Sequence, residues 1–198
     1  ENIWNFLFFT GYLKKTDVRM EENVHYISMA IPNEEVRVIF KNTVLSWFEQ
    51  KISKKDLTPL YKSILEGRCE DFETAVSQML REGISFYDTK ESFYRGFLMG
   101  LLNGLEDYYA FSNRESGLGR YDICLKPMEA DKPAVLMELK VAAGYGELEE
   151  RSSQALQQIL EKEYERELVW EGYREVLCYG IAFYKKSCRI KLEKHKLS

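Results

Sequence analysis

The segment from residue 119 to residue 141 constrains the fold of this chain most. It reads as two β-strands joined by a polar turn, with Asp122 on the first strand and Glu138 and Lys140 on the second. Because side chains alternate across a strand, Glu138 and Lys140 share one face, and only apolar residues occupy the other. A carboxylate and an ammonium on such a segment are costly to bury unless they are paired or bind a metal. These three residues are therefore the main candidates for a functional site.

The composition predicts one good hydrophobic core, or one core with a small additional module, because 45% of the 198 residues are hydrophobic. The net charge of -4 gives no general attraction to nucleic acid, so any such binding needs a local basic patch. No apolar run reaches the roughly 18 residues of a membrane span, so no membrane partner is predicted. The four cysteines form no C-x-x-C pair, which favours free thiols and a cytoplasmic location. The chain begins with Glu1 inside an apolar pattern, and we expect a piece of a longer protein.

Residues 1–84 are interpreted as a helical linker module, winged-helix-like, at the end of a preceding domain. The elements expected here are helices at residues 2–13, 33–50, 57–66 and 69–81 and a strand at residues 24–31. The first half of this module carries no basic cluster, which favours a connecting role over docking to nucleic acid.

Residues 85–198 are interpreted as an α/β domain that opens with a helix at residues 89–108. Asp88 followed by Glu91 three residues later is a capping-box pattern, which is one interpretation of Glu91. The other is that Glu91 projects toward the sheet beside Asp122. Arg95, one turn later, could pair with Glu91 or contact a phosphate.

The rest of this domain alternates strands with one long helix. The elements expected are strands at residues 109–112, 175–184 and 188–193, the two strands of residues 119–141, and a helix at residues 147–172. A strand, a helix and a strand of these lengths form a crossover, so part of the sheet should be parallel. The chain contains neither the phosphate loop of ATPases nor a dinucleotide-binding glycine pattern.

Two carboxylates and a lysine fit the hydrolysis of a phosphodiester. The anionic ester repels nucleophiles, so the reaction needs a cation that neutralises the phosphate and acidifies a water molecule. Mg²⁺ prefers oxygen ligands and needs few carboxylates, which Asp122 and Glu138 could supply. Lys140 could orient or deprotonate the water, and Gln158 could fix the phosphate or the water. The two histidines, His25 and His195, are far apart in the sequence, which argues against a zinc site.

Four segments resemble the PD-(D/E)XK nuclease superfamily, and more closely the nuclease-like C-terminal domain of bacterial proteins with an N-terminal AAA-type ATPase-like domain. These segments are ESFYRGFLMGLL, SNRESGLGRYDICLKP, AVLMELKV and ALQQILEKEY. The resemblance covers residues 85–193 and implies a restriction-endonuclease-like core, α-β-β-β-α-β, with a mixed sheet flanked by helices. NIWNFLFFTGYL and AIPNEEVRVIF are similar to the region that joins the two domains in that group.

The resemblance implies a role for each candidate residue. The metal-binding acids would be Asp122 and Glu138, and the catalytic lysine would be Lys140. The remaining implied site residues are Glu91, as the helix acid, and Gln158, as the later helix glutamine. Two departures are visible: Tyr121 precedes Asp122 where the superfamily pattern has proline, and Arg95 stands where relatives have histidine.

The function predicted from the sequence is Mg²⁺- or Mn²⁺-dependent hydrolysis of phosphodiester bonds, with DNA favoured over RNA as the partner. Two alternatives stay open. One is a catalytically silent nuclease-fold module that binds nucleic acid or protein beside an ATPase-like domain. The other is a structural ion-pair cluster, in which Lys140 pairs with Glu138 or Asp122. Endonuclease or exonuclease action, sequence preference and oligomeric state stay undetermined.

Overall fold

The computed structural model describes residues 2–21, 24–33, 55–83, 90–116 and 119–196, and the helix expected at residues 33–50 lies outside them apart from residue 33. The described helices are α1 (Asn2–Phe9), α4 (Thr58–Glu66), α5 (Cys69–Gly83), α6 (Glu91–Leu102), α7 (Leu148–Glu161) and α8 (Glu165–Trp170). The described strands are β1 (Lys14–Glu21), β2 (Val24–Ala30), β3 (Tyr108–Ser116), β4 (Gly119–Pro127), β5 (Ala134–Val141), β6 (Glu175–Tyr184) and β7 (Ser187–Lys196). Within these residues, no helix has both the length and the apolar character needed to cross a bilayer.

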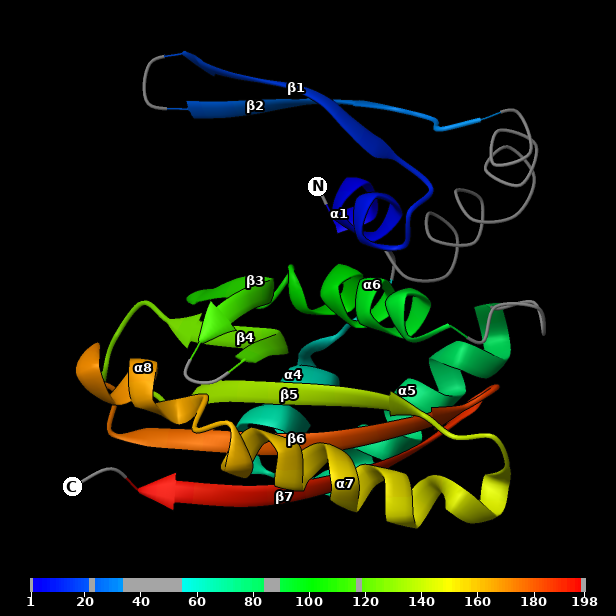
Figure 1. The fold of residues 1–198 in the computed structure, drawn as a ribbon, viewed down its shortest axis with the longest axis vertical. Coiled ribbons are helices and arrows are strands. Elements are labelled where there is room, and N and C mark those ends of the chain that lie inside the picture. Colours follow the sequence, from blue (N-terminus) through cyan, green and yellow to red (C-terminus); the bar gives the residue numbers. More distant parts are fainter. Residues whose placement is uncertain (1, 22–23, 34–54, 84–89, 117–118, 197–198) are drawn as a thin grey trace.

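A mixed sheet of the order β3-β4-β5-β6-β7 forms the centre of the molecule (Figure 1). β5 and β6 run parallel, and each of the other neighbouring pairs is antiparallel. The connection from β5 to β6 passes through α7 and α8, which is the predicted crossover. The sequence α6-β3-β4-β5-α7-β6 therefore confirms the expected α-β-β-β-α-β core.

Helices cover both faces of this sheet, as the resemblance described above implies. Val135, Met137 and Leu139 lie in the core beneath α4, α5 and α6, whereas Ala134 and Leu136 lie in the core beneath α7 and α8. Each face therefore buries one half of the alternating pattern. Glu138 follows Ala134 and Leu136 on the α7 side, where the apolar core ends.

The larger core crosses the predicted boundary between residues 84 and 85. Phe72 of α5 packs edge-on against Tyr179 of β6, with ring centroids 5.6 Å apart, and the Tyr179 hydroxyl donates to the Ile64 carbonyl of α4. α4 and α5 are therefore part of the layer that covers the sheet. The division into residues 1–84 and 85–198 stays a prediction.

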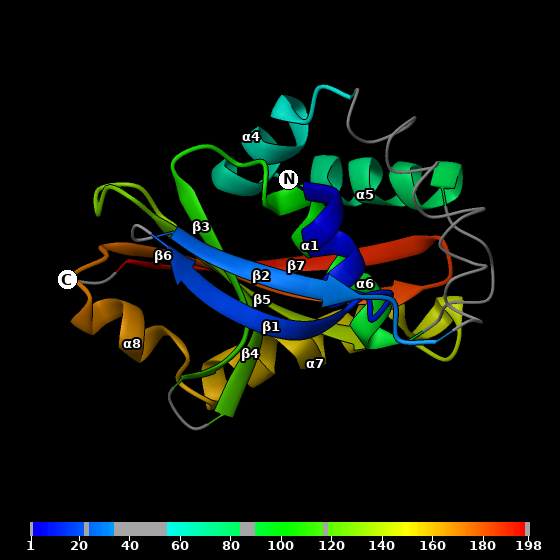
Figure 2. The same cartoon turned by 90° about the horizontal axis from the view of Figure 1, so that it is seen from above.

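α1 and a two-stranded hairpin lie beyond α6 (Figures 1 and 2). α1 packs closely on α6, because Gly96 lacks a side chain; a Cβ there would lie 2.6 Å from the Thr10 backbone nitrogen. Gly11 follows α1 with φ +82°, which agrees with the predicted helix stop. β2 confirms the strand expected at residues 24–31, and β1 is its antiparallel partner.

The single helix expected over residues 147–172 is wrong. A 3₁₀ turn at Tyr145–Glu147 precedes α7, and α7 ends before α8 begins. Glu163 has a left-handed backbone, φ 53°, which an α-helix does not accommodate. The break directs the buried ring of Tyr164 against Tyr121 of β4, with ring centroids 6.3 Å apart. Tertiary packing therefore overrides the helical preference of this segment.

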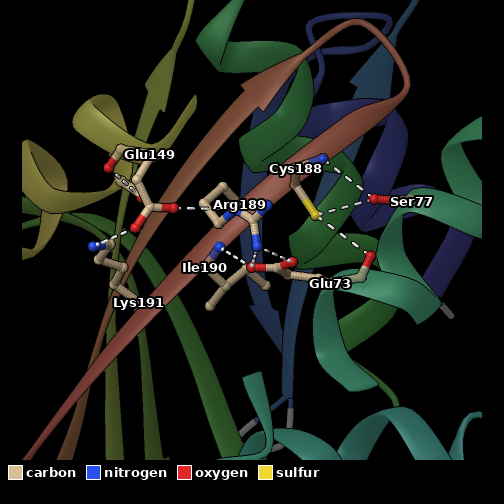
Figure 3. A network of polar contacts seen from close by, with 8 residues as sticks. Glu73, Ser77, Glu149, Cys188, Arg189, Ile190 and Lys191 are labelled. Carbon is tan, nitrogen blue, oxygen red and sulfur yellow. Dashed lines mark hydrogen bonds and ion pairs between the residues drawn. The ribbon is translucent and has the colours of Figure 1, made fainter. Parts of the chain in front are cut away.

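Side chains of α5 cover the outer edge of β7 (Figure 3). The backbone N–H of Ile190 donates to Glu73 at 2.8 Å, and that of Cys188 donates to the Ser77 hydroxyl at 3.2 Å. Arg189 extends the network, because it pairs with Glu73 at 3.1 Å and with Glu149 of α7 at 3.4 Å. Two backbone donors at this edge are thus bonded within the protein.

Candidate active site

The candidate site lies where β4 and β5 separate. Backbone pairing between these strands runs from Ile123 to Leu125 on β4, opposite Val135 to Met137 on β5. The N–H of Leu139 lies beyond that ladder and donates to Oδ2 of Asp122 at 2.9 Å. The Asp122 carboxylate therefore accepts the hydrogen bond that a carbonyl of a neighbouring strand would otherwise accept from this buried amide. This bond fixes the Asp122 side chain beside β5.

Gln158 joins the two candidate residues of β5. Its amide nitrogen donates to Oε1 of Glu138, and its amide oxygen accepts a hydrogen bond from Nζ of Lys140 at 2.7 Å. The structure thus brings Glu138, Lys140 and Gln158 together from β5 and α7. Among the described residues, Lys140 donates to this amide and to neither carboxylate.

Arg95 is the ionic partner of Asp122. The sequence predicts contact of Arg95 with Glu91 or a phosphate, but its Nη1 donates to Oδ1 of Asp122 at 2.9 Å. Their side chains are 21% and 10% exposed, so this pair is mostly shielded from water. The ion-pair cluster considered above has Lys140 paired with Glu138 or Asp122. Within the described part of the chain, Lys140 instead bonds to Gln158, and Asp122 pairs with Arg95.

Glu138 lies in an unfavourable environment for a charged carboxylate. It is 5% exposed, and its Oε2 atom is buried without a hydrogen-bond partner among the described residues. Burial and, to a smaller extent, the negative charge of Asp122 raise the pKa of Glu138 to about 8, although the positive charge of Lys140 opposes the rise. The carboxyl therefore holds its proton near neutral pH unless a cation compensates its charge.

Glu91 lies at the first position of α6, directly after Lys90 as N-cap, and Asp88 falls outside the described residues. The capping-box interpretation, which needs Glu91 at the third helical position, is therefore wrong. Although Glu91 is exposed, partial burial and then the charge of Asp122 raise its pKa, and Arg95 lowers it. Its carboxyl thus lies within electrostatic range of Asp122. The projection of Glu91 toward the sheet stays a prediction.

Tyr164 is a neighbour of the site that the sequence pattern hides. Its hydroxyl donates to the Arg120 carbonyl at 2.9 Å, which ties the start of β4 to the segment after α7. Burial raises the pKa of Tyr164, and a hydrogen bond with the Gln158 side chain opposes that rise. The sequence offers little indication of this role. Tyr164 lies six residues after Gln158, inside a segment for which one continuous helix was expected.

Asp122 and Glu138 are the carboxylates of this site that could hold a divalent cation. No group of three or more His, Cys, Asp or Glu in the described ranges is arranged to hold a metal ion. Mg²⁺, however, is commonly held by one or two carboxylates and keeps several waters. The unpartnered oxygen of Glu138, next to the charge of Asp122, is a position that a cation would stabilise.

A family model described as the PD-(D/E)XK nuclease superfamily matches residues 89–193, more than half of the chain. The chain belongs to this superfamily. The match spans α6 to β7 and includes Glu91, Asp122, Glu138, Lys140 and Gln158. No curated protein matched the chain.

At the separation of the two strands, the sequence resembles the pattern in the name of the PD-(D/E)XK superfamily. Glu138, Leu139 and Lys140 have the E-x-K form in the superfamily name, and the acid Asp122 precedes them on the neighbouring strand β4. The Asp122 carboxylate and the E-x-K strand are joined through the Leu139 amide. Membership in this superfamily therefore indicates nuclease chemistry as the function class.

Proposed function

We propose that this protein is a metal-dependent nuclease that hydrolyses phosphodiester bonds, with DNA preferred to RNA. Superfamily membership supports the reaction class. One observation carries the site: Glu138 is buried near the Asp122 carboxylate, with one oxygen lacking a hydrogen-bond partner among the described residues. Such a pair of acids is costly without a cation, and a divalent ion would offset both burial and repulsion.

Asp122 and Glu138 are the residues that would hold Mg²⁺ or Mn²⁺. When bound, such an ion neutralises the phosphate and acidifies a water molecule. Lys140, which is partly exposed beside Glu138, orients that water and stabilises negative charge on the phosphate. Gln158 holds Lys140 and Glu138 in a fixed relation, and Glu91 adds negative charge near Asp122.

The test is cleavage of double-stranded DNA, single-stranded DNA and RNA in the presence of Mg²⁺ or Mn²⁺. Lys140→Ala should lower the rate by about 10²-fold or more, the usual contribution of a positioned proton-transfer group. Lys62→Ala is the matched control, because Lys62 is an exposed lysine of α4. Equal cleavage by the wild type and Lys140→Ala would identify a contaminant and remove the proposal.

A catalytically silent nuclease-fold module is the second candidate, and the Arg95–Asp122 ion pair favours it. The guanidinium already compensates the charge of Asp122 without any metal. Calorimetry with Mn²⁺ separates the two candidates. Absence of binding to the wild type, or undiminished binding to Asp122→Ala, would support the silent module.

We also propose that this domain follows an N-terminal ATPase-like domain in a bacterial, cytoplasmic protein. The support is the similarity of the first residues to the joining region in that group. None of the four cysteines, all of which the structure describes, is in a disulfide, which suits a reducing compartment. Sequencing the coding region upstream of Glu1 tests the domain order, since an unrelated upstream sequence would contradict it.

A further inference from the structure

The two oxygens of Asp122 have partners of different kinds. Oδ2 accepts the backbone N–H of Leu139 at 2.9 Å and is part of the framework of β5. Oδ1 accepts from the side chain of Arg95 at 2.9 Å. Oδ1 is therefore the oxygen that can exchange its partner without disturbing the backbone.

Arg95 can leave Asp122 only by a movement of its side chain. The backbone of α6 is held at the next residue, where Gly96 lies against the backbone of Phe9 and Thr10. The Arg95 side chain is 21% exposed, so its long stem has a route toward water. The guanidinium stays charged at all relevant pH values. It therefore brings a permanent positive charge to Oδ1.

A divalent cation at Asp122 and Glu138 would have to enter beside that charge. Lys140 supplies a second positive charge, which acts on both Glu138 and Glu91. Like charges a few ångströms apart repel strongly in a partly buried site, where screening by water is weaker than at the surface. Removal of the Arg95 charge should therefore favour the cation.

We propose that Arg95 competes with the divalent cation for Oδ1 of Asp122. The inference rests on the proposed function, because it takes Asp122 and Glu138 as the metal-binding pair. Arg95 holds the metal-free site together, and the ion displaces its guanidinium. The protein consequently needs a higher metal concentration than its two carboxylates alone would need.

Calorimetric titration with Mn²⁺ alone tests this competition on the whole chain. Arg95→Gln should bind Mn²⁺ about tenfold more tightly than the wild type. A tenfold change in Kd is a smaller free energy than the repulsion expected between two nearby unit charges in a partly buried site. Arg95→Lys keeps the charge and should stay closer to the wild type. Arg166→Gln is the matched control, because it removes the same charge from an ion pair with Glu163 in which the Arg166 side chain is 63% exposed. This variant should bind Mn²⁺ as tightly as the wild type does.

A second measurement uses the wild type and so does not depend on the folding of a variant. Addition of Mg²⁺ should shift the side-chain Nε–H signal of Arg95 in an NMR spectrum and leave that of Arg166 unchanged. Equal or weaker Mn²⁺ binding by Arg95→Gln, or an Arg95 signal that does not respond to a bound ion, would overturn the competition. If neither the wild type nor Arg95→Gln binds Mn²⁺, the metal site of the proposed function fails and the inference falls with it.

Discussion

Glu138 and Gly180 are direct neighbours in the parallel pair of β5 and β6. Gly180 determines how closely α7 approaches the sheet beside Glu138. A Cβ on Gly180 would lie 2.2 Å from the Ser152 carbonyl oxygen and 2.3 Å from the Leu156 backbone nitrogen. The missing side chain lets α7 approach until Gln158 reaches Glu138. A glycine with no chemistry of its own thus positions the amide of the candidate site.

Gly180→Ala should therefore destabilise the protein and separate Gln158 from Glu138. Both clashing atoms belong to the backbone of α7, so the helix must shift, at a cost of roughly 1–3 kcal/mol. Urea denaturation measures the loss, and metal-dependent cleavage should fall with it. Gly144→Ala is the control, since a Cβ at Gly144 meets nothing within 4 Å. Equal stability of the two variants would contradict this account of α7.

The stability of the metal-free protein should depend on pH through Glu138. Its pKa rises to about 8 in the folded state, so the folded protein binds this proton more tightly than the unfolded chain does. The stabilising contribution is complete below the ordinary glutamate pKa and is lost as the pH rises through about 8. Denaturation in a chelator at pH 5, 7 and 9 measures it.

Glu138→Gln provides the comparison for this pH series. Relative to the variant, the wild type should lose roughly 3–5 kcal/mol between pH 5 and pH 9, at about 1.4 kcal/mol per pKa unit. A difference that does not change with pH would refute the prediction. A variant that is less stable at every pH would instead favour the ion-pair cluster considered from the sequence.

Tyr164→Phe should test whether the phenol positions the site. The ring stays in place while the bond to the Arg120 carbonyl is lost, at a cost of about 1 kcal/mol. Tyr173→Phe is the matched control, because the Tyr173 hydroxyl also donates to a carbonyl, that of Pro127, on the same strand β4. Both variants should lose similar stability, but only Tyr164→Phe should lower the cleavage rate at saturating substrate. Equal rates in the two variants would assign Tyr164 a purely structural role.

Glu73→Ala should expose the edge of β7. The substitution leaves the Ile190 N–H and the Arg189 guanidinium without this partner, at a cost of roughly 1–3 kcal/mol. Glu70→Ala removes the same charge from an exposed position at the start of the same helix and should cost at most about 1 kcal/mol. Light scattering on storage should show more association of Glu73→Ala than of the wild type or Glu70→Ala. Equal scattering by the three proteins would show that Glu73 is not needed to protect this edge.

The order of elements around the site could be predicted because its signals are local. The alternation along residues 134–141 predicted that Glu138 and Lys140 share one face of the strand, and in the structure both bind Gln158 of α7. The strand expected at residues 175–184 agrees with β6, and the helix expected at residues 69–81 agrees closely with α5. Periodicity of apolar residues suffices for such elements.

Features set by tertiary contact could not be predicted. β1 was missed because its sequence, KKTDVRME, is mostly polar or charged, and pairing with β2 defines it. The partner of Arg95 was missed because Asp122 is 27 residues away in the sequence and meets it only when α6 packs on the sheet. The break before Tyr164 was missed because burial of its ring, and not a proline or glycine, ends α7.

The bonding of β7 to α5 has a consequence for assembly. Since Glu73 and Ser77 already accept hydrogen bonds from Ile190 and Cys188, an incoming strand would find those two donors taken. The opposite margin of the sheet is β3, whose described partner is β4 on one side only. Among the described residues, the two margins of the sheet therefore differ: two backbone donors of β7 are bonded to side chains of α5, and β3 has β4 as its strand partner.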